Sequence, residues 1–312
     1  STLRVTPEEI TAFFNDAYRN NLLAIPRTSQ QVHDEAKRRE INPIKWLLYN
    51  YLYFRVPLFS PDKFLTKTLK YVRPFASKTA FFIYTLLTFF GLYLLTTRWD
   101  EYLNTFTYFF NFEGLLFYSL AIISVKVIHE LSHAYTAKYY KTRVAAIGIV
   151  FIVLWPALYT DVTDSWRLDR RRSRLAISFA GVAAELILAG LCTLGWGLSE
   201  PGLMQSIFFV ISSASWLTTL AININPAMRF DGYYLLCDLW GVDNLQFRAF
   251  AMARWKLREL LLGIKVPPPE EGISEKRLWG MVVYSIYTWF YRVSLYTAIA
   301  IFIYFKWCRR RI

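Results

Sequence analysis

Cysteine and charged side chains are scarce in this sequence, and each shortage excludes a class of protein. The three cysteines, Cys192, Cys237 and Cys308, lie far apart, so they form neither a disulfide framework nor a CxxC metal motif. Charged residues make up 19% of the 312 positions, whereas a soluble domain usually carries about a quarter. The composition therefore argues against an ordinary soluble domain.

Apolar and aromatic residues are abundant instead, at 55% and 18% of the chain. Phe, Tyr and Trp in excess suit a protein that contacts both hydrocarbon and the headgroup belt of a membrane. The net charge of +13 would suit nucleic acid, but the basic residues cluster beside the apolar runs. This placement indicates the lipid bilayer as a partner and no nucleic acid. The polar first residues predict no signal peptide.

The apolar runs predict an all-α polytopic membrane protein with about five transmembrane helices. Lysine and arginine follow the second run, so we expect that end to be cytoplasmic. The predicted spans cover residues 80–97, 114–138, 175–198, 205–224 and 279–305.

The apolar segment 144–160 differs from these runs because it is rich in β-branched residues and interrupted by Gly148 and Pro156. If it spanned the membrane, the arginine-rich residues 166–174 would lie on the extracytoplasmic side. A re-entrant or β-like membrane loop fits better, since irregular backbone at depth must be buried in protein. An extended substrate could pair with this loop edge-on. A bulky side chain at Gly148 is then expected to reduce cleavage and leave the metal bound.

The chain divides into three predicted regions. Residues 1–78 form a cytoplasmic or interfacial helical region, with an amphipathic helix near 6–25 and a helix with an aromatic face over 30–59. Residues 79–245 form the transmembrane core. Residues 246–312 comprise a basic amphipathic surface helix over 246–265 and the last transmembrane helix.

The stretch KVIHELSHAY, residues 126–135, places a lysine, a glutamate and two histidines within an apolar run. Charges in a bilayer cost at least about 2.5 kcal/mol each, so such residues usually serve a function. His129 and His133 are one helical turn apart and can share one tetrahedral zinc ion. Glu130 is placed to accept a proton from bound water. The alternative, two histidines that are merely hydrogen-bonded, is less favoured in an apolar span.

A catalytic zinc usually has three protein ligands, so one more is needed. His33 lies in the polar N-terminal region, whereas Asp231 follows the fourth span and is expected at the same membrane face as His133. Pro226 prevents a regular helix there, and Gly232 permits close backbone approach. We predict Asp231 as the third ligand. The alternative is an ordinary Asn-Pro turn in which the aspartate caps a helix.

An H-E-x-x-H motif in one span and N-x-x-P-x-x-x-x-D-G in a later one resemble the site-2 protease family of intramembrane zinc metallopeptidases. Asn223, Pro226, Asp231 and Gly232 match the second motif. The "RFDGYY" sequence, "RVPLFSPDKFL" and residues 159–181 resemble a bacterial branch of the family associated with membrane-fusion and efflux-type partners. The resemblance covers most of residues 50–300.

The resemblance implies a site-2-protease-like core and a multi-pass protein of the bacterial inner (cytoplasmic) membrane. It implies that His129, His133 and Asp231 bind Zn²⁺ and that Glu130 is the general base. Asn223 would stabilise the tetrahedral oxyanion. A membrane-fusion or efflux-type partner protein is also implied.

The implied activity is that of an intramembrane zinc metalloendopeptidase. It would hydrolyse a membrane-embedded or membrane-delivered protein or peptide near the cytoplasmic face, using zinc-activated water with Glu130 as base. The alternative is a non-proteolytic scaffold, or a subunit of a peptide export or efflux complex, that retains the fold. Glu130 argues against this alternative, because a structural zinc needs no base. An ion transporter would need more intramembrane carboxylates.

Two further polar residues lie in apolar spans. Lys126 is one turn before His129 and either tunes the site or extends its ammonium group to the headgroups. Glu185 is surrounded by small residues in the third span, which indicates a close helix contact. It either satisfies a neighbouring element or supports a zinc ligand from behind.

Overall fold

The computed structural model describes residues 10–11, 13–15, 53–108, 111–152, 155–263, 266–270 and 272–308. The chain forms two compact units, one of residues 1–54 with 151–155 and one of residues 55–150 with 156–312. In the smaller unit, the rings of Phe54 and Phe151 stack with centroids 4.7 Å apart. The site described below lies entirely in the larger unit.

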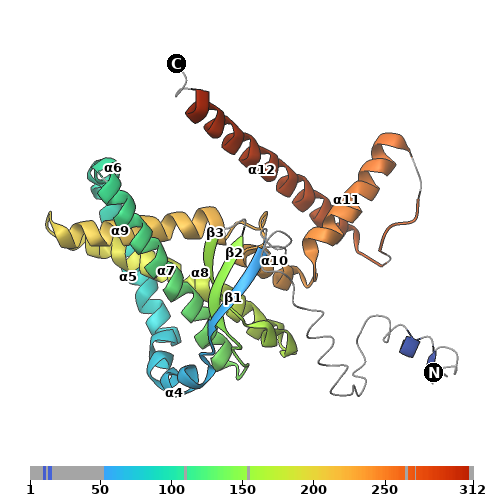
Figure 1. Ribbon diagram of the computed structural model, residues 1–312, viewed down its shortest axis with the longest axis horizontal. Coiled ribbons are helices and arrows are strands. Elements are labelled where there is room, and N and C mark those ends of the chain that lie inside the picture. The colour runs from blue at the N-terminus through green and yellow to red at the C-terminus, as the bar shows by residue number, and fades with distance from the viewer. Residues whose placement is uncertain are drawn as a thin grey trace, which may run out of the picture. The chain divides into compact units, whose positions relative to one another are not determined.

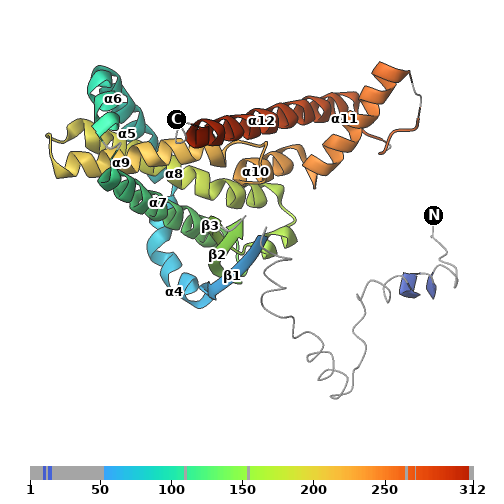
Figure 2. The same cartoon turned by 45° about the horizontal axis from the view of Figure 1, so that its top comes forward.

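Five helices of the described chain are long and apolar enough to cross a membrane (Figures 1 and 2). The prediction of about five spans is confirmed at this level. The helices are α5 (Lys78–Thr97), α7 (Phe112–Tyr139), α8 (Arg171–Leu198), α9 (Leu203–Leu217) with its π-helical continuation η3 (Thr218–Asn223), and α12 (Glu275–Cys308).

Helix α8 is central to the larger unit and packs against α5, α7 and α9. Glycines permit the closest of these contacts. A Cβ atom at Gly190 would lie 2.0 Å from Thr88 Oγ1, and one at Gly91 would lie 2.8 Å from the backbone nitrogen of Leu194. The small residues of α8 therefore bring the helices close together, as in other membrane helix pairs.

The described strands form one sheet in the order β1 (Tyr53–Phe59), β2 (Ile147–Ile152) and β3 (Trp155–Thr160). The predicted β-like segment thus forms β2 and β3, while its depth in a membrane stays a prediction. Because β2 is central, an extended substrate cannot pair with it; only β1 and β3 have an outer edge.

The prediction of a helix over 30–59 is wrong at residues 53–59, which form β1. Pro57 lacks an N–H group and disfavours a helix, but it is compatible with an edge strand. Gly148 accommodates β1, because a Cβ atom there would lie 2.2 Å from the carbonyl oxygen of Val56. Residues 10–11 and 13–15 are helical. The rest of 1–52, with His33, lies outside the described residues.

Shorter helices complete the described chain. The predicted helix over 246–265 is observed as α11 and ends at Gly263, whose φ of 64° is left-handed. Tyr233, Leu245 and Met281 form an apolar cluster between α10, α11 and α12. The shorter elements are α4 (Asp62–Val72), η1 (Arg73–Ala76), α6 (Trp99–Tyr108), η2 (Thr163–Arg167), α10 (Asp231–Trp240) and α11 (Leu245–Leu262).

Candidate metal centre

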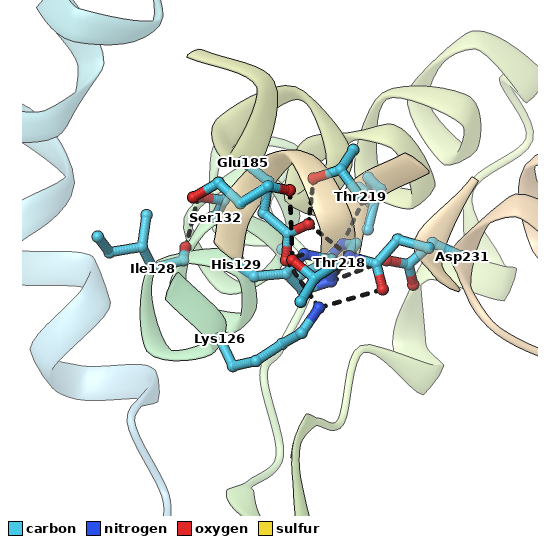
Figure 3. A network of polar contacts seen from close by, with 12 residues as sticks. Lys126, Ile128, His129, Ser132, Glu185, Thr218, Thr219 and Asp231 are labelled. Atoms are coloured by element: carbon cyan, nitrogen blue, oxygen red, sulfur yellow. Dashed lines mark hydrogen bonds and ion pairs between the residues drawn. The ribbon is translucent and has the colours of Figure 1, made fainter. Parts of the chain in front are cut away.

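Helix α7 presents two buried imidazoles on one face, as the i, i+4 spacing predicts. His129 and His133 are only 3% and 7% exposed. Their Nε2 atoms lie 3.2 Å apart. Figure 3 shows His129 at the centre of a polar network that joins α7 to several other elements.

Asp231 enters the site as the first residue of α10. Its Oδ2 atom lies 2.7 Å from His129 Nε2 and 3.5 Å from His133 Nε2. One ligand atom from each of the three residues lies within 4.8 Å of the others. The structure therefore brings together the three residues that the sequence predicted as ligands.

The segment between η3 and α10 leaves the helical conformation, as Pro226 predicts. Two tyrosines of α12 hold this segment: Tyr284 donates to the carbonyl oxygen of Pro226 and Tyr287 to Asn225 Oδ1. A Cβ atom at Gly232 would lie 2.2 Å from the carbonyl oxygen of Ile224. Glycine is thus required for the close approach that places Asp231 beside the histidines.

Helix α10 is also fixed to α8. The Arg171 guanidinium donates to the carbonyl oxygens of Asp238 and Leu239. Ser178 Oγ donates to Asp238 Oδ2 at 3.1 Å. Part of the arginine-rich stretch therefore helps to position the helix that carries Asp231.

An oxygen atom beside Nδ1 indicates the tautomer of each imidazole. His133 Nδ1 lies 2.7 Å from the carbonyl oxygen of Ile177, which can only accept, so this nitrogen carries a proton. His129 Nδ1 lies 2.9 Å from Glu185 Oε1 and faces a carboxylate in the same way. Both rings therefore direct an Nε2 lone pair toward the same point, as metal-binding histidines do.

The donor set and the space fit a zinc ion. Two ligands at 2.0–2.1 Å from a tetrahedral zinc lie about 3.3 Å apart. Two of the three observed separations, 3.2 and 3.5 Å, are close to this value, and the third is shorter, at 2.7 Å. Gly181 of α8 leaves room, because a Cβ atom there would lie 2.5 Å from Nε2 of both histidines. Sequence reasoning did not single out Gly181, since nothing in the pattern indicated which face of α8 meets the histidines.

The charge state of Asp231 suits a metal ligand. Burial raises the pKa of its carboxyl group, but the two histidines beside it outweigh burial and hold the pKa below its usual range. The side chain is therefore an anionic oxygen donor at neutral pH. A neutral N, neutral N, anionic O set leaves one position open on a tetrahedral metal.

Glu130 follows the first histidine in α7. Its backbone carbonyl accepts a hydrogen bond from Thr160 Oγ1 at 3.1 Å. Thr160 is the last residue of β3. The sheet is thus connected to α7 at the position of the predicted base, a contact that the sequence did not indicate.

Asn223, the predicted oxyanion donor, ends η3 and is 5% exposed. Its Nδ2 donates to Glu185 Oε2 at 2.5 Å, and its Oδ1 accepts from Lys126 Nζ at 3.1 Å. Lys126 also donates to Glu185 Oε1 at 2.7 Å. Lys126 therefore points into the protein, and Glu185 satisfies neighbours on two other elements.

The apolar helices and the His129, His133 and Asp231 cluster agree with the protein family that the sequence matches. Residues 117–227 match Peptidase family M50. The M50 match includes His129, Glu130, His133 and Asn223 and ends four residues before Asp231. It agrees with the site-2 protease resemblance and supports, at the level of the family, a membrane zinc metalloprotease.

A curated relative gives further support. The chain is 23% identical over 130 residues to a protein of Bacillus subtilis (strain 168) named "Putative peptide zinc metalloprotease protein YydH". The alignment covers 41% of this chain and 49% of that protein, so the chain spans about half the length of this relative. No solved structure matches.

Proposed function

We propose that this protein is an intramembrane zinc metalloendopeptidase that hydrolyses a membrane-embedded or membrane-delivered protein or peptide near the cytoplasmic face. One observation carries the proposal: His129 Nε2, His133 Nε2 and Asp231 Oδ2 lie within 4.8 Å of one another, and Glu130 directly follows His129 in the chain. The cluster lies among helices long enough to cross a membrane. The bacterial inner membrane is the proposed location.

The chemistry divides among residues of this chain. His129, His133 and Asp231 would hold Zn²⁺, which when bound lowers the pKa of water and polarises a carbonyl group. Glu130 takes the proton of the attacking water as general base. It then passes that proton to the amine that leaves as the peptide bond breaks.

Asn223 is proposed to donate to the oxyanion of the tetrahedral intermediate. Its amide has two N–H groups, and the bond to Glu185 uses one of them. The other can serve the oxyanion. A single well-placed donor of this kind contributes roughly 3 to 4 kcal/mol to transition-state stabilisation.

A substrate must present an extended peptide bond, because helical carbonyl groups are already hydrogen-bonded. Strand β3 has an outer edge in the described sheet and ends at Thr160, which bonds to the Glu130 carbonyl. Within the segment 144–160, β3 is therefore the proposed docking strand. Pairing there would lead an extended substrate toward Glu130.

The proposal is tested by comparing protein N-termini in membranes of cells producing the wild-type protein or Glu130→Ala. New N-termini that appear only with the wild type are expected, with equal zinc in both purified proteins. Identical N-termini, with zinc bound in both proteins, would contradict proteolysis. That result would favour the non-proteolytic scaffold, for which the efflux-type partner remains a prediction.

A further inference from the structure

Behind the three metal-facing atoms lies a second buried polar cluster of Glu185, Lys126, Thr219 and Asn223. Glu185 is 0% exposed and sits in the middle of α8. Its neighbours come from α7 and η3, so the carboxyl group joins three elements at once (Figure 3). A fully buried carboxyl group is costly unless it is paired and hydrogen-bonded.

Four polar groups surround this carboxyl group. Oε1 accepts from Lys126 Nζ at 2.7 Å and faces His129 Nδ1 at 2.9 Å. Oε2 accepts from Thr219 Oγ1 and Asn223 Nδ2, each at 2.5 Å. Each of the four can donate a hydrogen bond. Lys126, Thr219 and Asn223 donate hydrogen bonds to it, and His129 lies at ion-pair distance. An ionised carboxylate, which has no donor of its own, suits all four.

Two of these donors come from the π-helical segment η3. Thr219 and Asn223 are four residues apart in Thr218–Asn223, and both donate to Oε2. Isolated π-helical turns frequently occur at functional sites. Here the turn fixes one oxygen of Glu185, which leaves the other for His129 and Lys126.

We propose that Glu185 is a positioning residue that sets the orientation and tautomer of His129 for zinc, and that Lys126 balances its charge. This inference rests on the proposed zinc site. A carboxylate on Nδ1–H of a histidine raises the basicity of the metal-facing nitrogen and fixes the ring. Lys126 neutralises the carboxylate, so the buried cluster carries one charge of each sign.

The test is zinc affinity of the purified protein in detergent, measured by competition with a chelator. Glu185→Gln is expected to weaken zinc binding about 10- to 100-fold. Glutamine keeps the size but turns one oxygen into a donor, which then faces two other donors. It also leaves the Lys126 ammonium without a counter-charge close to the proposed zinc site.

The double variant Glu185→Gln with Lys126→Met separates positioning from general packing. Removing the unpaired ammonium is expected to restore part of the lost affinity, so the double variant should bind zinc more tightly than Glu185→Gln alone. If the cluster served only packing, the second substitution would add to the loss. A double variant that binds more weakly than the single one therefore contradicts the proposal.

Cobalt provides a second readout. Visible absorption of the Co²⁺-loaded protein reports the ligand field, so Glu185→Gln is expected to shift the bands of the wild type. Thr219→Val is a milder variant that keeps every charge and removes one donor to Oε2. It should shift the bands in the same direction and less, and it keeps the test decisive if Glu185→Gln does not fold.

The positioning role would be overturned if the folded Glu185→Gln protein had wild-type zinc affinity and unshifted cobalt bands. If only Thr219→Val folds, the same result in that variant would overturn it. Either outcome would leave the proposed peptidase intact. A wild-type protein that takes up neither zinc nor cobalt would overturn both proposals. The two failures are therefore distinguishable.

Discussion

The Nδ1 atom of His133 lies 2.7 Å from the carbonyl oxygen of Ile177, one helical turn before Gly181 on α8. The same face of α8 thus offers an acceptor that fixes the imidazole and, at Gly181, the space in front of its Nε2 atom. Helix α8 shapes the proposed metal site without supplying one of the proposed ligands.

Replacing Gly181 with alanine should therefore impair metal binding. The new Cβ atom would lie 2.5 Å from Nε2 of both histidines and occupy the space for the ion. We expect zinc per protomer, measured by elemental analysis, to fall well below that of the wild type. Gly202→Ala is the matched control, because a Cβ atom at Gly202 meets nothing within 4 Å. Full zinc content in Gly181→Ala would show that this space is not the metal site.

Substitution of Gly148 by valine tests the sheet separately from the metal. The new side chain would collide with the carbonyl oxygen of Val56 and disrupt the pairing of β1 with β2. Zinc content should be unchanged, since the proposed ligands lie on α7 and α10, while cleavage should decrease. Zinc content and cleavage should be measured on the same preparation. Undiminished cleavage would exclude a role of the sheet in presenting substrate.

Asp62 gives a prediction about pH. It accepts two hydrogen bonds from Lys138 Nζ, at 2.8 and 2.9 Å, and one from the Val144 backbone N–H. The hydrogen bond from Lys138 is the main reason that the pKa of Asp62 lies below its usual value. These contacts tie α4 to the end of α7 and to the chain just before β2.

A carboxyl group with a lowered pKa stabilises the folded state fully above its unfolded pKa of about 3.9, and the effect is lost as the pH falls through the lower folded value. Asp62→Asn should therefore lower the Tm at neutral pH. The difference in Tm between wild type and variant should shrink once the pH is below about 4. Thermal unfolding in detergent across this range is the measurement, and a difference that grows on acidification would contradict the assignment.

Much of the fold is predictable because long apolar runs leave a chain few alternatives to spanning helices. The shared face of His129 and His133 and the break at Pro226 are predictable too, because each depends only on neighbouring residues of the chain. Strand β1 is harder to predict, because its partner β2 lies about ninety residues further along the chain. Gly148 leaves room for β1, but this role can be recognised only once the pairing of β1 with β2 is known.

The polar cluster behind the histidines is predictable only in part. The sequence indicates that Glu185 needs partners, because a lone acid in an apolar span is costly. It does not indicate which partners, since Lys126, Thr219 and Asn223 reach Glu185 only once α7, α8 and η3 have packed. For the same reason, the sequence favours an ammonium group of Lys126 that extends to the headgroups, whereas in the structure it bonds to Glu185 and Asn223.

The most direct test of the central claim is zinc per protomer in detergent-purified wild-type protein, beside Asp231→Ala and Glu130→Ala. The account predicts close to one zinc in the wild type and in Glu130→Ala, because the base is not a ligand, and a large loss in Asp231→Ala. A wild type that stays free of zinc when zinc is supplied would contradict the account.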